Sequence, residues 1–212
     1  MGIFIYIVVL LFSVIMHEFA HGYAAYLRGD DTAKHAGRLT FNPVPHIELF
    51  GSIILPAALV LIQAPVLFGW AKPVPVNGAK FKNPKVDIPL VSIAGPAANI
   101  LIAVVSGIGI RIIHMMPSFE QGFGGSISSV LYIMVIVNVV LLVINLIPIP
   151  PLDGSKVITL FLPQDIAVKY IRLNPFLCMI TLIVLLWSGI LWQVLGPVIS
   201  ILTVIVSGVP LR

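Results

Sequence analysis

Five long stretches of apolar, almost uncharged residues constrain the fold of this chain more than any other feature of its sequence. A helix needs about 20 mainly apolar residues to cross the hydrocarbon core of a bilayer. The stretches reach that length and run roughly over residues 3–26, 50–69, 88–110, 128–147 and 176–208. The sequence therefore predicts an all-α, polytopic membrane protein with about five transmembrane helices, within a range of about four to six.

Composition and charge agree with a location in lipid. Hydrophobic residues make up 59% of the chain and charged residues only 9%, against roughly a quarter charged in a soluble domain. The formal charge of +4 does not indicate nucleic-acid binding, because the Lys and Arg residues lie in loops beside apolar stretches, where they set topology. The connections are too short for a separate soluble domain of about 100 residues. We expect a single membrane domain over residues 1–212.

A metal-binding pattern lies near the end of the first apolar stretch, in His17-Glu18-Phe19-Ala20-His21. Residues four apart project from one face of a helix, so His17 and His21 can bind one ion with Glu18 beside it. Zinc with an open position activates a bound water, and Glu18 can take that water's proton as general base. Such a pentapeptide also arises by chance. Here it follows uncharged residues 3–16, where an ionisable group is costly enough to indicate function.

A catalytic zinc ion usually has three protein ligands, so the two histidines require a third. The candidates are the other histidines and carboxylates, namely His35, His46, Glu48, Asp87, His114, Glu120, Asp153 and Asp165. We favour Asp153, because it follows a proline-rich segment that ends an apolar stretch. Unwound backbone at membrane depth is tolerated only where it is buried in protein or lines a water-filled cavity. The alternative is an ordinary Asp-Gly turn.

Three weaker candidates for substrate contact surround these ligands. Asn145 could donate a hydrogen bond to the substrate carbonyl or the developing oxyanion, and the alternative is a helix-packing amide. For Asn99 we favour helix packing over substrate contact, because its neighbours are small. The alternation in Pro73-Val74-Pro75-Val76 excludes a helix interior and predicts an edge strand or extended loop. That edge could pair with an unwound segment of substrate.

Together these motifs resemble the signatures of the site-2 protease family. The resemblance rests on His17-Glu18-x-x-His21 and on Asn145-x-x-Pro148-x-Pro150-x-x-Asp153-Gly154. Gly95-Pro96-x-x-Asn99 and the Pro-Val alternation are similar to further family elements, so the likeness covers roughly residues 10–160. It implies that the two histidines and the aspartate bind zinc and that the glutamate activates water. The chain has no insertion long enough for a PDZ domain and no extra span before the one that contains the histidine motif, as in the short, stand-alone prokaryotic branch.

These features predict an intramembrane zinc endopeptidase that cleaves transmembrane segments of other membrane proteins, with one zinc ion per chain. We expect its catalytic core at about 3–160 and a C-terminal helical hairpin at about 176–208. A substrate helix must unwind before attack, because its amides are hydrogen-bonded. The alternative is a membrane zinc transporter or another metal-binding membrane protein. Glu18 separates the two, because coordination requires ligands but no base.

The topology predicts that the site opens toward the cytoplasm from the cell membrane. The histidine motif and Asp153 must reach the same zinc ion, so the loops that follow them should lie on the same side of the membrane. The chain between these two loops must then cross the membrane an even number of times. We therefore expect residues 50–69 to enter the membrane and return. Arg111 then lies alone on the opposite side, and the excess of basic residues marks the first side as cytoplasmic. Those residues are Arg28, Lys34, Arg38, Lys72, Lys80, Lys82, Lys85, Lys156, Lys169 and Arg172.

Overall fold

The computed structural model describes residues 2–62 and 71–209, and every regular element within these ranges is a helix. The longest helices are α1 (Gly2–Leu27), α4 (Pro84–His114), α6 (Gly125–Asn145) and α10 (Ile190–Ser207). Shorter α-helices are α2 (Thr32–His35), α3 (Leu55–Leu61), α5 (Pro117–Phe119), α7 (Asp153–Val157), α8 (Gln164–Ile171) and α9 (Pro175–Trp187). Short 3-10 or π turns lie at Val44–His46, Leu49–Ile54, Gly78–Lys80, Glu120–Gly124 and Ile158–Leu160.

Four helical segments in the described part of the chain are long and apolar enough to cross a membrane. They are Phe4–Leu27, Pro84–His114, Pro117–Asn145 and Ile190–Ser207. A fifth would be α8 and α9 taken together, although the two are bent by 80°. The prediction of an all-α membrane protein with about five spanning helices is therefore confirmed.

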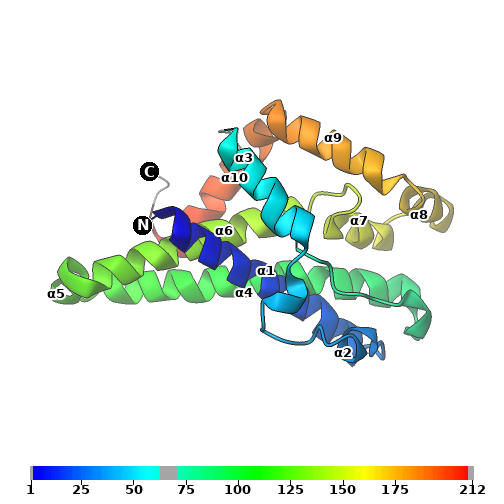
Figure 1. The fold of residues 1–212 in the computed structure, drawn as a ribbon, viewed down its shortest axis with the longest axis horizontal. Coiled ribbons are helices and arrows are strands. Elements are labelled where there is room, and N and C mark those ends of the chain that lie inside the picture. The colour runs from blue at the N-terminus through cyan, green and yellow to red at the C-terminus, as the bar shows by residue number, and fades with distance from the viewer. Residues whose placement is uncertain (1, 63–70, 210–212) are drawn as a thin grey trace.

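Helix α4 packs against α1, α6 and α10, and it runs beside α6 in Figure 1. Its apolar contacts with α6 and α10 form a buried cluster of Ala103, Ile110, Val135, Val139 and Ile199. Gly107 permits the close approach of α10, because a Cβ there would lie 2.3 Å from the carbonyl oxygen of Val206. Small residues at such crossings favour helix association in lipid. This bundle supports the polar site.

The apolar stretch at 50–69 includes most of the turn Leu49–Ile54 and the short helix α3, while its residues 63–69 lie outside the described part. The chain segments on either side of it meet, because the Lys72 N–H donates to the carbonyl oxygen of His46 at 2.9 Å. The segment between them therefore begins and ends at one depth. This geometry fits a segment that returns to the side it left.

Candidate metal centre

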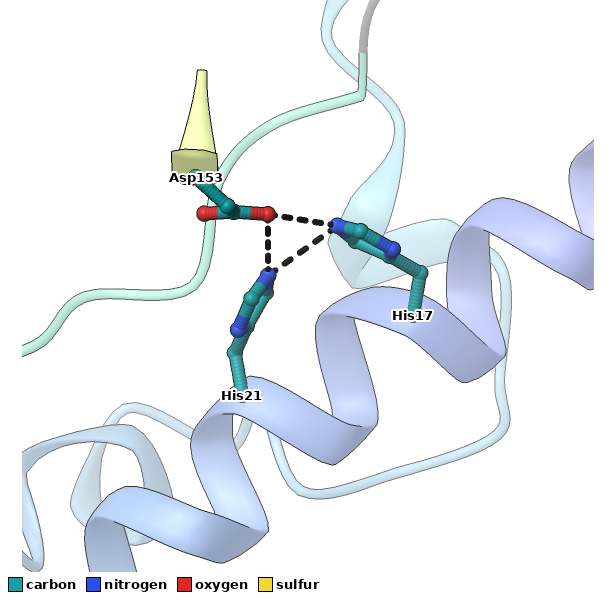
Figure 2. A group of neighbouring side chains, drawn as sticks. All are labelled: His17, His21 and Asp153. Carbon is teal, nitrogen blue, oxygen red and sulfur yellow. Dashed lines mark hydrogen bonds and ion pairs between the residues drawn. The ribbon is translucent and has the colours of Figure 1, made fainter. Parts of the chain in front are cut away.

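His17 and His21 on α1 and Asp153 at the start of α7 converge on one point (Figure 2). The Asp153 Oδ2 atom lies 3.2 Å from Nε2 of His17 and 3.0 Å from Nε2 of His21. The two Nε2 atoms lie 3.0 Å apart. All three residues are buried. In the described part of the chain, this is the only group of three or more His, Cys, Asp or Glu residues with the spacing for a metal ion.

Hydrogen bonds on the far side of each imidazole orient both rings. Nδ1 of His21 lies 2.7 Å from the carbonyl oxygen of Val91, which can only accept, so Nδ1 is the donor. Nδ1 of His17 lies 2.6 Å from the Oδ1 atom of Asn99. With a proton on each Nδ1, both Nε2 atoms of the neutral rings present lone pairs to the centre.

This donor set fits a zinc ion. Two imidazole nitrogens and a carboxylate oxygen at 3.0–3.2 Å from one another could bind a single cation. Zinc takes both ligand types at about 2.0–2.2 Å, and a tetrahedron with such bonds separates its ligand atoms by about 3.3–3.6 Å. The three residues would leave its fourth position open, as catalytic zinc sites do.

Two glycines make room for this arrangement. A Cβ on Gly95 of α4 would lie 2.4 Å from Nε2 of His21 and 2.6 Å from Nε2 of His17. The space beside the two ligand atoms is therefore free because residue 95 has no side chain. A Cβ on Gly154 would lie 2.3 Å from the carbonyl oxygen of Leu146, so Gly154 allows α7 to approach the end of α6. That approach brings Asp153 to the histidines.

Glu18 is held by an extended segment, residues 71–77, which forms no strand in the described chain. The Val74 N–H donates to Oε2 of Glu18 at 2.8 Å. Arg38 donates to the carbonyl oxygens of Lys72 and Pro73 at 3.1 and 3.0 Å. The Pro-Val alternation is thus an extended loop, the second of the two predicted conformations. It lies against the residue predicted to be the general base.

The two asparagines lie in different environments. Asn145 is partly buried at the end of α6, where one N–H of its amide donates to the carbonyl oxygen of Leu141 at 2.9 Å. Asn99 is fully buried, and its amide contacts His17, a candidate metal ligand, on one side and Asn138 of α6 on the other. Sequence reasoning missed Asn138 and Ser13, which extend this buried network. The available indication was their polarity within apolar stretches.

Comparison with known proteins gave one family and two curated relatives. The model of the family described as "Peptidase family M50" matches residues 107–188. "Putative zinc metalloprotease YwhC" of Bacillus subtilis (strain 168) is 38% identical over 198 residues, which are 90% of this chain and 85% of that protein. "Putative zinc metalloprotease Rip2" of Mycolicibacterium smegmatis is 30% identical over 154 residues, which are 72% of this chain and 56% of that protein. No solved structure matches the chain significantly.

Proposed function

This chain belongs to peptidase family M50, the site-2 proteases, and we propose that it is an intramembrane zinc endopeptidase that cleaves the transmembrane segments of other membrane proteins. The observation that carries the proposal is the convergence of two imidazole lone pairs and a carboxylate within an apolar helical bundle. His17 lies ten residues before the end of α1 at Leu27, or about 15 Å along the helix. The site is thus within the length of a spanning helix.

His17, His21 and Asp153 would hold one zinc ion per chain. The ion would supply a Lewis acid for the scissile carbonyl and lower the pKa of the attacking water. Asp153 uses its other oxygen, Oδ1, to meet the Nζ of Lys156 at 3.5 Å. This contact leaves Oδ2 directed at the two histidines.

Glu18 would accept the proton of the attacking water and pass it to the leaving amine, as a general base and then acid. The Val74 N–H occupies one carboxylate oxygen, Oε2, and fixes the orientation of the side chain. The other oxygen is the one we assign to the water. We propose that Asn145 contacts the substrate carbonyl through the N–H that does not bond to Leu141, where an amide donor would stabilise the developing oxyanion.

An unwound substrate segment could pair with residues 73–76. Pro73 and Pro75 have no backbone N–H, and the Val74 N–H already donates to Glu18. The groups left for pairing are therefore the carbonyl oxygens of Val74 and Pro75 and the backbone of Val76, a residue that is 40% exposed. Such strand addition would place the scissile bond beside Glu18.

Co-expression of the chain with single-pass membrane proteins tests the proposed function. Wild type should yield a truncated substrate, and Glu18→Gln should not, although it retains zinc. The variant is a matched one, because the glutamine carbonyl can still accept from the Val74 N–H while an amide cannot take the water's proton. Cleavage by Glu18→Gln at the wild-type rate would remove Glu18 from the mechanism. If no substrate is cleaved even by the wild type, and Glu18→Gln reduces the uptake of zinc by the cells, the result would favour a transporter.

A further inference from the structure

We infer that Asn99, Asn138 and Ser13 form a hydrogen-bond chain of fixed direction that determines which ring nitrogen of His17 carries the proton. The chain joins three helices, since Ser13 lies on α1, Asn138 on α6 and Asn99 on α4. All three side chains have an exposed fraction of 0%. The inference deepens the proposed zinc site and rests on it. The three residues are positioning residues, because they act on the ion only through His17.

The direction of the chain is fixed at its far end by two carbonyl oxygens. The Ser13 hydroxyl lies 2.8 Å from the carbonyl oxygen of Val9, which can only accept, so the hydroxyl donates there. Its oxygen is then an acceptor for Asn138 at 2.8 Å. The same Asn138 atom lies 2.9 Å from the carbonyl oxygen of Met134. That atom must therefore be the amide nitrogen, Nδ2.

The orientation of Asn138 determines that of Asn99. With Nδ2 directed at Ser13, the Oδ1 atom of Asn138 faces Asn99 and accepts from its amide nitrogen at 2.8 Å. Asn99 consequently directs its own Oδ1 at Nδ1 of His17, 2.6 Å away. Because that oxygen can only accept, Nδ1 carries the proton and Nε2 keeps its lone pair for the ion.

Reversing either amide would place donor against donor or acceptor against acceptor in an interior without solvent. The network therefore has one low-energy arrangement, and this arrangement prepares His17 for metal binding. His21 reaches the same state through one contact with the carbonyl oxygen of Val91. Partners of this kind behind a ligating histidine typically change metal affinity by about 10–100-fold when they are removed.

Two substitutions of Asn99 separate a positioning role from helix packing. Asn99→Asp keeps an acceptor for Nδ1 of His17 but loses the donor to Oδ1 of Asn138, whereas Asn99→Leu keeps the approximate volume and removes both. If Asn99 only packs helices, leucine should be the better replacement in both stability and zinc binding. Our inference predicts the opposite order for zinc. The dissociation constant should rise about 10–100-fold for Asn99→Leu and clearly less for Asn99→Asp.

Asn138→Leu tests the more distant part of the chain, because Asn138 does not contact either histidine directly. It should weaken zinc binding while the protein remains folded, since Asn99 is then free to reverse its amide. Thr203→Val is the matched control. Thr203 is also fully buried in the bundle, and its hydroxyl oxygen has no hydrogen-bond partner among the described residues. Its zinc affinity should equal that of wild type.

Zinc affinity is measured on the purified full chain in detergent by competition with a chromogenic chelator, and the melting temperature of each variant is recorded beside it. Weaker binding in Asn99→Leu and Asn138→Leu, with a clearly smaller loss in Asn99→Asp and wild-type affinity in Thr203→Val, supports the inference. Wild-type affinity in both leucine variants overturns it. Failure of the wild-type chain itself to bind zinc would instead overturn the proposed function, so the two failures are distinguishable.

Discussion

Gly95 borders the two histidines of the candidate metal centre so closely that a single methyl group should disturb the site. Gly95→Ala would place a Cβ 2.4–2.6 Å from the Nε2 atoms of His21 and His17, so we expect zinc binding and proteolysis to fall at least tenfold, since a ligand ring must move. The measurement is zinc content after dialysis, together with cleavage. Gly196→Ala is the control, because a Cβ at that helical position meets no atom within 4 Å. Full zinc content in Gly95→Ala would show that the ligands do not need this space.

The sequence could predict the candidate metal ligands, because their arrangement depends on local helix geometry. It could predict much less of the hydrogen-bond network that orients them. The spacing of His17 and His21 determines that they share a helix face. Asp153 could be selected from the prolines before it, because they end a helix. Asn138 and Ser13 could not be assigned, since they are 125 positions apart and meet only when α1 and α6 pack together. The close approach of Gly95 to the histidines depends in the same way on the packing of α4 against α1.

Asp30 anchors one end of the extended segment 71–77, so a substitution of Asp30 should loosen that segment. Asp30 is fully buried and accepts the Asn77 N–H at 2.6 Å. Burial by itself would raise the pKa of Asp30, but hydrogen bonds from Thr32 and Asn77 outweigh it and lower the pKa. A lowered pKa means that the anchor contributes fully at neutral pH and is lost only as the pH falls through that lowered pKa.

Asp30→Asn should therefore loosen the segment at neutral pH, because the new NH₂ group faces backbone and side-chain donors. We expect a loss of about 1–3 kcal/mol in stability, reduced cleavage and unchanged zinc content. Hydrogen exchange of the amides at 72–77 measures the loosening. Asp31→Asn is the neighbouring control, since its partner Lys80 forms a partly exposed ion pair of small energetic value. Equal exchange rates in both variants would show that Asp30 does not hold the segment.

For elements, helix positions could be predicted from apolar length, but the exact positions of the interruptions could not. The apolar stretch at 176–208, for which the sequence predicts a helical hairpin, is divided at Gly189, which has a φ of 76° in the left-handed region that glycine adopts readily. The hydropathy alone does not give the position of that break. The backbone contact between Lys72 and His46 joins the two ends of the stretch at 50–69, and no local pattern encodes it. The expectation that this stretch returns to one side rests instead on the even number of crossings that one shared metal site would require.

At the scale of the whole molecule, we predict that the loops before and after residues 47–71 lie on the cytoplasmic side. Single cysteines at Thr40 and Lys80, in a Cys178→Ser background, should react with a membrane-impermeant reagent from that side only. A cysteine at Ser118, in the short helix α5 between α4 and α6, should react from the opposite side because one crossing separates it from Lys80. Reaction of Thr40 and Lys80 from opposite sides would mean that residues 47–71 cross the membrane.

Zinc titration of the purified chain in lipid vesicles tests the proposed activity most directly. The substrate is a peptide with one apolar transmembrane segment, and zinc content and cleavage are measured on the same samples. We predict one zinc ion per chain at full activity, because the described residues contain a single suitable ligand group. Removal of the ion should abolish cleavage, and restored zinc should return it in proportion to occupancy. Undiminished cleavage by protein shown to be free of zinc would contradict the proposal that this chain is a zinc endopeptidase.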